Sequence, residues 1–195
     1  MPNYHALTAQ RLAGTVQVSR PVAPKSVTSE SPALDVMTDL RKTYAAVIEP
    51  QVTMESANAY MKQRGVRSLL VLNQDRILAG FITTADILGE KPLRFIRERG
   101  VKYNEILVAD IMTPLNHLEA IPIQEVQHAK VGDVIASLRE NGCQHTLVME
   151  KNAAGALVVC GIFSLTQIGK QLGIAIPSTE IAKTFAEIEA AVIAN

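Results

Sequence analysis

Apolar residues recur at intervals of three and four in residues 54–64 and 131–141, with polar residues between them. This spacing predicts a helix with one buried face in each segment. Thr53 precedes the first helix as a side-chain cap, and Gly65 and Gly142 follow the helices where a left-handed residue ends a helix. Short apolar runs bounded by turn residues flank both helices and predict strands, so we expect an α/β (α+β) fold.

The predicted elements occur twice in the same order: strand, helix, strand, strand, helix. In the first half, they lie at residues 45–48, 54–64, 68–72, 77–83 and 84–88. In the second half, they lie at residues 119–123, 131–141, 146–150, 156–163 and 165–172. Ser31 and Pro32 also predict the start of a short helix over residues 33–41.

The residues repeat together with the elements. Asp35-Val36-Met37-Thr38 recurs as Asp110-Ile111-Met112-Thr113, and Gly80-Phe81-Ile82-Thr83 recurs as Gly161-Ile162-Phe163-Ser164. A duplication that keeps its order indicates two copies of one small unit, and a unit of this size does not bury its apolar face alone. We therefore expect the two copies to pack against each other.

These patterns divide the chain into five parts. They are an irregular N-terminal arm, a first repeat, a charged connector, a second repeat and a C-terminal amphipathic helix, at residues 1–30, 31–92, 93–108, 109–177 and 178–195. The arm has no acidic residue before Glu30, so a transit peptide is the alternative to an irregular arm. The C-terminal helix is expected to pack on its own body or, alternatively, on a second subunit.

Composition argues against several classes of function. The chain has 195 residues, of which 19 are basic and 19 acidic, and a net charge of +0 gives no electrostatic reason to bind nucleic acid or an anionic membrane. The longest apolar run, residues 153–163, is too short to span a bilayer. Cys143 and Cys160 indicate small buried thiols in a reduced, cytoplasmic protein. His128 and His145 do not repeat at metal-ligand spacing, so no metal site is expected.

Three repeated motifs resemble the cystathionine β-synthase (CBS) domain. They are the Asp-Ile-Met-Thr segment, the Gly-Val-Arg-x-Leu-x-Val strand of residues 65–71 and the junction Gly80…Thr83-x-x-Asp86. Their order in both copies resembles a Bateman module, a tandem pair of CBS domains, here as a stand-alone CBS-pair protein. The resemblance implies two β-α-β-β-α repeats packed with pseudo-twofold symmetry. It also implies a homodimer and two clefts between the repeats, each of which can hold AMP, ADP, ATP or S-adenosylmethionine.

The first of these clefts would use Thr83 and Asp86. The resemblance implies that the Asp86 carboxylate accepts hydrogen bonds from the ribose hydroxyls and that Thr83 contacts ribose or phosphate. The chemistry is complementary, because a 2′,3′-diol offers two donors and a carboxylate two acceptor oxygens. The alternative is that Asp86 only caps the helix that begins at Thr84. The second repeat is expected to complete this first cleft with Val131, Cys143, Gln144 and His145.

The second cleft carries Ser164 and Gln167 at the positions of Thr83 and Asp86. Gln167 is neutral and offers one carbonyl acceptor, so the second cleft is predicted to be the weaker ribose site. Its predicted lining is Ser164, Gln167, Val52, Ala57, Val66, Arg67 and Ser68. Few basic residues are predicted near either cleft, with Arg67 in the second and Lys130 beside the first, so a monophosphate or a neutral adenosyl compound is favoured as much as ATP.

Two functions remain open. The first is a non-catalytic regulatory sensor that binds an adenosyl ligand between the repeats and transmits a conformational change to a protein partner, which the sequence does not name. The second is a ligand-free structural or oligomerisation module. Catalysis is not expected, because neither a Gly-rich phosphate loop nor a nucleophile–base set is present. Apolar helix residues could form a dimer surface or belong to the core: Met54, Met61, Ile87, Leu88, Leu138 and Ile168.

Overall fold

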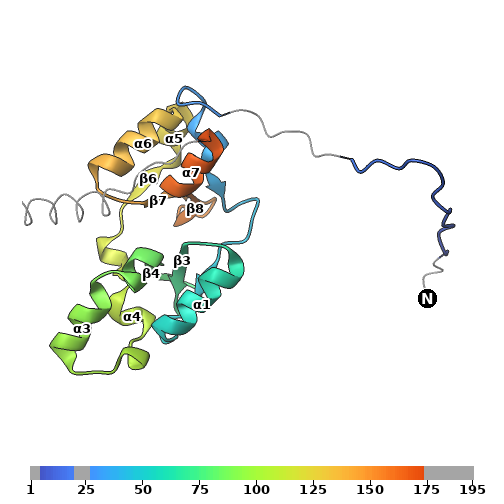
Figure 1. The fold of residues 1–195 in the computed structure, drawn as a ribbon. Coiled ribbons are helices and arrows are strands. Elements are labelled where there is room, and N and C mark those ends of the chain that lie inside the picture. The colour runs from blue at the N-terminus through green and yellow to red at the C-terminus, as the bar shows by residue number, and fades with distance from the viewer. Residues whose placement is uncertain (1–4, 20–26, 174–195) are drawn as a thin grey trace, which may run out of the picture.

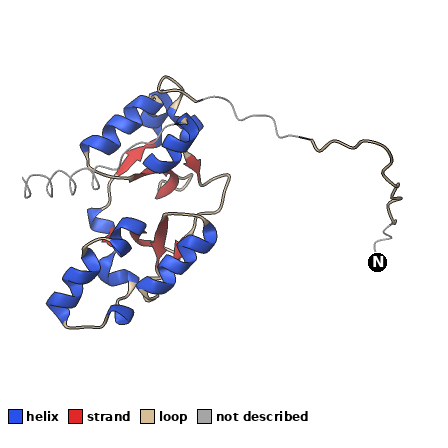
Figure 2. Cartoon of the chain, in the orientation of Figure 1, coloured by secondary structure: helices blue, strands red, loops and turns tan. Residues whose placement is uncertain are grey.

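A computed structural model describes residues 5–19 and 27–173 (Figure 1). Within these ranges the chain forms two four-stranded sheets, with strand orders β2-β3-β4-β5 and β1-β8-β7-β6. The sheets face each other across a shared apolar layer, and the helices lie on their outer sides (Figure 2). The two repeats predicted from the sequence are thus two sheet-and-helix units of one α+β fold.

The first sheet belongs mainly to the first repeat. Its strands are β2 (Val47–Ile48), β3 (Ser68–Leu72), β4 (Leu78–Thr83) and β5 (Thr113–Pro114). Strands β2 and β3 are parallel, whereas the β3–β4 and β4–β5 pairs are antiparallel. The accompanying helices are α1 (Met54–Arg64), α2 (Thr84–Leu88), α3 (Lys91–Arg99) and α4 (Val108–Ile111).

The second sheet repeats this arrangement. Its strands are β1 (Thr38–Asp39), β6 (Ala120–Pro122), β7 (His145–Lys151) and β8 (Leu157–Ser164). Strands β6 and β7 are parallel, and β8 is antiparallel to both β7 and β1. Its helices are α5 (Ile123–His128), α6 (Val131–Glu140) and α7 (Leu165–Leu172). Short 3-10 turns lie at η1 (Ala33–Val36), η2 (Tyr103–Glu105) and η3 (Leu115–His117).

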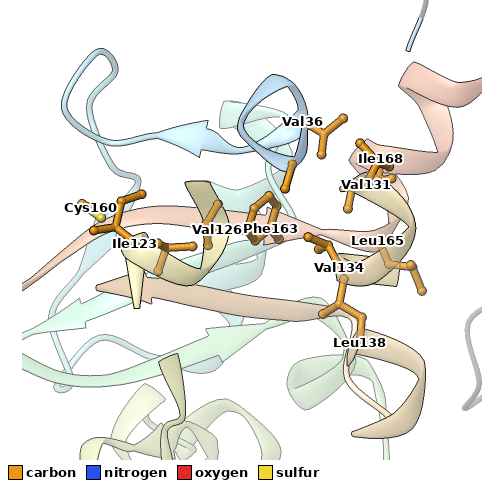
Figure 3. Close-up of a cluster of buried hydrophobic side chains, with 12 residues drawn as sticks. Val36, Ile123, Val126, Val131, Val134, Leu138, Cys160, Phe163, Leu165 and Ile168 are labelled. Atoms are coloured by element: carbon orange, nitrogen blue, oxygen red, sulfur yellow. The ribbon is translucent and has the colours of Figure 1, made fainter. Parts of the chain in front are cut away.

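The repeats exchange their leading segments, residues 35–39 and 110–114. The first leading segment pairs with β8 of the second repeat, where Thr38 lies opposite Ile162. The second pairs with β4 of the first repeat, where Thr113 lies opposite Phe81. Val36 accordingly lies in the second repeat's core (Figure 3). Each sheet is therefore complete only when both repeats are present.

Three clusters of buried residues hold the layers together. One lies between the second sheet and its helices, around Phe163 and Leu138, and is shown in Figure 3. A second lies between the first sheet and its helices, around Ile82 and Met54. The third joins the two sheets through Leu70, Phe81 and Leu147. Because both faces of each sheet are buried, their central strands are continuous apolar runs rather than alternating ones.

Several predicted elements have the predicted bounds, namely residues 54–64, 68–72, 84–88 and 165–172. Thr53 accepts a hydrogen bond from the Ser56 N–H, and Gly65 is left-handed with φ 64°. The predicted helix over residues 33–41 is wrong beyond Val36. Met37 is extended (φ −75°, ψ 132°), which lets the next two residues pair with β8.

Two further stretches differ from their sequence-based description. The connector holds α3 and α4, and Pro92 lies in the first turn of α3. The strand predicted over residues 119–123 ends at Pro122, where α5 begins. Residues 5–19 have exposed side chains and no helix or strand. The predicted C-terminal helix, residues 178–195, lies outside the described residues.

The apolar helix residues considered for a dimer surface are mostly internal. Met54, Met61, Ile87, Leu138 and Ile168 are buried in the two helix–sheet clusters, and Leu88 is 65% exposed. In the described ranges, no helix has the length and apolar character needed to cross a membrane. No group of three or more His, Cys, Asp or Glu side chains is placed there to hold a metal ion.

A methionine from each leading segment rests on a glycine of the other repeat's sheet. A Cβ atom at Gly161 would lie 2.5 Å from the Met37 Sδ atom, and one at Gly80 would lie 2.7 Å from the Met112 Sδ atom. A side chain at either position would force the methionine to move, and at Gly80 it would also meet the Thr113 carbonyl oxygen at 2.6 Å. The two equivalent glycines of the repeated motif are therefore required where the exchanged segments cross the sheets.

Replacing Gly161 by alanine should lower the free energy of unfolding by about 1–3 kcal/mol, because the new methyl group overlaps the Met37 side chain. Urea unfolding of both proteins measures this. Gly132→Ala in α6 is the matched control, since its Cβ would meet nothing closer than 3.4 Å. It should be neutral or stabilising. Equal effects of the two substitutions on the free energy of unfolding would show that the Met37–Gly161 contact does not exclude a side chain at residue 161.

Candidate ligand-binding clefts

The first cleft lies between the two repeats and has a volume of about 750 Å³. The end of β4 and the start of α2 supply Thr83 and Asp86, and the start of β7 supplies Gln144 and His145. The segment between β5 and β6 closes a further side with His117, Leu118, Glu119, Ala120 and Ile121. A cleft of this size accommodates a nucleoside or a small nucleotide.

Asp86 caps helix α2 with one of its oxygens. Its Oδ2 atom accepts hydrogen bonds from the Thr83 N–H and the Thr83 hydroxyl, both at 2.7 Å. The Asp86 N–H donates to the Thr83 Oγ1 atom at 3.2 Å, which completes a reciprocal capping box. The capping alternative considered from the sequence is therefore realised, and it uses Oδ2.

The other oxygen of Asp86 forms an ion pair. Its Oδ1 atom lies 2.5 Å from the Lys91 Nζ atom, which also donates to the Ile111 carbonyl at 3.2 Å. The Asp86 side chain is 12% exposed and the Lys91 side chain 47%. A ribose diol that used Oδ1 would have to displace a half-exposed ammonium group.

His145 lines both clefts. Its ring meets Phe81 edge-on, with centroids 5.9 Å apart, and its buried Nδ1 atom has no hydrogen-bond partner among the described residues. Burial and, secondarily, the charge of Arg67 lower the pKa of His145 to about 4, against the opposing effect of Asp86. The imidazole is therefore neutral at pH 7 and offers an unpartnered polar atom beside an aromatic ring.

The second cleft has a volume of about 500 Å³ and lies on the other side of His145. The end of β8 and the start of α7 supply Ser164 and Gln167, and the start of β3 supplies Arg67 and Ser68. Unlike Thr83, Ser164 makes no side-chain hydrogen bond to its helix. Arg64 and Lys170 also line this cleft.

Most of the proposed residues line two clefts, in each of which the helix start of one repeat faces the strand start of the other. Thr83, Asp86, Cys143, Gln144 and His145 line the first cleft. Val66, Arg67, Ser68, Ser164 and Gln167 line the second.

Four residues lie elsewhere. Val131 and Ala57 are fully buried on the core-facing sides of α6 and α1, and Val52 packs against the first repeat's core. These corrections share a cause: apolar residues at helix starts were placed at a cleft but belong to the helix–sheet core. Lys130 pairs with Glu30 at 2.6 Å and does not line either cleft.

Sequence reasoning missed the ends of the two leading segments and the residues that follow them. They contribute Thr113, His117 and Glu119 to the first cleft, and Thr38, Thr43 and Tyr44 to the second. The signal available was the repeat itself, because these residues end or follow the duplicated Asp-x-Met-Thr motif in both copies. The duplication alone does not reveal that the leading segments are exchanged, so it does not place these residues at the clefts.

Comparison with known proteins adds a match to one domain family. The model of the CBS domain matches residues 18–92. The chain contains a CBS domain. The second sheet-and-helix unit repeats the order of elements of the first, so the fold is that of a tandem CBS pair. No curated protein matches the chain by sequence.

Solved structures share this fold, and two of the three that follow are described as CBS proteins. A conserved protein from Pyrococcus horikoshii is 24% identical with a TM-score of 0.54, over 77% of this chain and 98% of that one. A CBS-domain containing protein from Agrobacterium tumefaciens is 14% identical with a TM-score of 0.52, over 78% and 98%. CBSX2 from Arabidopsis thaliana, solved in complex with AMP, is 20% identical with a TM-score of 0.50, over 72% and 94%.

The partly buried His145 should make stability depend on pH. Its pKa is about 4 in the fold and 6.5 for an unperturbed imidazole, so between these values the unfolded chain binds more protons. The free energy of unfolding should therefore fall by up to about 3 kcal/mol as the pH drops from 6.5 to 4. Urea unfolding across this range should show a weaker pH dependence for His145→Gln than for the wild type. Replacement of the exposed His128 by glutamine should keep the wild-type slope, and an unchanged slope in His145→Gln would contradict the assignment.

Proposed function

We propose that this CBS pair is a non-catalytic regulatory module that binds an adenosyl ligand in the first cleft. The observation that carries the proposal is the position of Thr83 and Asp86 at the wall of a cleft of about 750 Å³ between the repeats. The AMP complex of CBSX2, which has the same fold, supports a ligand of this class.

The cleft walls offer complementary surfaces to the two parts of an adenosine. Phe81, Leu118 and Ile121 are apolar wall residues, and His145 adds a flat neutral ring. Such a wall suits a purine, which stacks on aromatic groups and is excluded from water by apolar ones. The polar end of the cleft holds Thr83 and Asp86, which suit the ribose hydroxyls.

Release of Lys91 makes Asp86 available. The Asp86–Lys91 pair involves a half-exposed ammonium, and pairs of this kind contribute about 1 kcal/mol or less. Two hydrogen bonds from a diol to the carboxylate would compensate for its loss, since bonds to charged groups are the stronger ones. The capping bonds to Oδ2 can remain while the diol binds Oδ1 and the outer side of the carboxylate.

A ligand in this cleft would act on the relative position of the repeats. It would contact the β4–α2 junction of one repeat and β7 of the other, and β4 and β7 both contribute to the sheet–sheet layer through Phe81 and Leu147. A ligand shifts an equilibrium only by binding one arrangement better than another, and a ligand that bridges two packed units meets this condition. The altered surface would then be read by a protein partner.

A ligand-free structural or oligomerisation module is the second candidate. It is favoured by the hydrogen bonds of Asp86, whose two oxygens already have partners in Thr83 and Lys91. The carboxylate therefore needs no ligand to satisfy it. This candidate predicts a protein whose stability and assembly do not respond to adenosyl compounds.

Thermal unfolding with adenosine, AMP, ATP and S-adenosylmethionine separates the two candidates. At about a hundred times the dissociation constant, the bound ligand should stabilise the protein by about 2.7 kcal/mol. Asp86→Asn should weaken binding about tenfold or more, because it removes the charge and one acceptor oxygen from the ribose site.

The control for this prediction is Asp110→Asn. Asp110 accepts a hydrogen bond from the Leu107 N–H at 2.8 Å and caps α4 much as Asp86 caps α2, but it does not line the first cleft. It should cost stability and leave ligand binding unchanged. No stabilisation by any of the four compounds, or equal losses of affinity in both variants, would favour the structural module.

A further inference from the structure

The two clefts differ in the sign of their charged residues. Among the described residues, the first cleft is lined by the carboxylates of Asp86 and Glu119 and by no lysine or arginine. The second is lined by Arg64, Arg67 and Lys170 and by no aspartate or glutamate. Few basic residues were expected near either cleft. Those that line a cleft are all in the second one, where Gln167 replaces the carboxylate of Asp86.

The three cations of the second cleft are available to a ligand. Within the described ranges, Arg64, Arg67 and Lys170 form no ion pair, and all three are exposed. Other basic side chains in the same part of the chain do have acidic partners, among them Arg41, Lys91 and Lys130. Several positive charges that line one cleft without nearby carboxylates raise the local concentration of anions.

Helix α7 adds to this positive potential. It begins at the second cleft with Ser164 and has no acidic residue in its first turn. In α2 the equivalent first turn carries Asp86, whose charge offsets the partial positive charge of the helix start. In α7 the equivalent residue is the neutral Gln167, so the start of α7 and the three cations act in the same direction.

We propose that the second cleft is an anion site that binds a phosphorylated ligand through its phosphate groups and not through a ribose. Arginine and lysine supply the charge, and the Ser164 and Thr166 hydroxyls and the Gln167 amide line the same cleft as hydrogen-bond donors. A volume of about 500 Å³ holds a short phosphate chain or a small phosphorylated metabolite. A ribose diol has no carboxylate to bind there.

This site is separate from the adenosyl site of the proposed function. Apart from His145, no described residue lines both clefts. Substitutions at the cations of the second cleft and at Asp86 of the first therefore test the two proposals one at a time. The failure of one proposal leaves the other standing.

Calorimetric titration with sodium tripolyphosphate at low ionic strength tests the anion site. The expected result is binding that weakens as salt is added, with a loss of about tenfold in Arg67→Gln and in Lys170→Gln. Arg97→Gln is the matched control, because Arg97 is exposed on α3 and does not line the second cleft. Asp86→Asn should also leave tripolyphosphate binding unchanged.

Titrations with adenosine and ATP identify the source of the phosphate. ATP binding to Asp86→Asn with the salt dependence of tripolyphosphate would mean that the phosphate chain of a nucleotide occupies the site. Tripolyphosphate binding without ATP binding to that variant would mean a phosphorylated ligand without a nucleoside. Absence of tripolyphosphate binding, or binding that Arg67→Gln and Lys170→Gln weaken no more than Arg97→Gln does, would overturn the proposal. Thermal unfolding of each variant without ligand checks that it is folded.

Discussion

Both clefts depend on the burial of two faces of each sheet. In β3, Leu69 and Val71 face the helices while Leu70 faces the other sheet, where it joins Phe81 and Leu147. Each such side chain contributes about 1.5–3 kcal/mol when fully buried. A shift of one residue in register would exchange the two faces, so side chains that fit one apolar layer would have to pack in the other. The sheet–sheet layer therefore fixes the relative position of the repeats, and the clefts open where that layer ends.

The exchange of leading segments makes this arrangement cooperative. Ile111 lies in the core of the first repeat and Val36 in that of the second, so each core contains residues that precede the other repeat's strands. The boundaries proposed from the sequence, 31–92 and 109–177, follow the duplication. They do not coincide with the sheets, because each sheet includes one strand from the other repeat. A ligand between the repeats thus acts on two units that share cores as well as a surface.

The sequence predicted those features that depend on local rules. Helix α1 follows from its apolar spacing, the Thr53 cap and Gly65, and all three are local. The helix predicted over residues 33–41 failed because its outcome is decided by a distant partner, β8, which Thr38 and Asp39 join. The same reason explains the missed cleft residues, since His117 and Tyr44 reach their clefts through the exchanged segments. Duplication showed which residues are equivalent, and the long-range pairing that decides their neighbours required the structure.

The opposite charges of the clefts follow from the way in which the repeats combine. Arg67 and Gln144 are equivalent, since their carbonyls accept hydrogen bonds of 2.9 Å from the Thr84 and Leu165 N–H groups at the helix starts. Asp86 and Gln167 are likewise equivalent. If each cleft were built within one repeat, Asp86 and Arg67 would share it and their charges would offset each other.

Each cleft instead takes its helix start from one repeat and its strand start from the other. Asp86 therefore meets Gln144, and Gln167 meets Arg67. Two differences between the copies, which would cancel within a repeat, give the clefts opposite signs when the repeats are crossed. A neutral His145 between the clefts adds no charge to either of them. Divergence at these two pairs of equivalent positions thus contributes to making two chemically distinct clefts from one repeated unit.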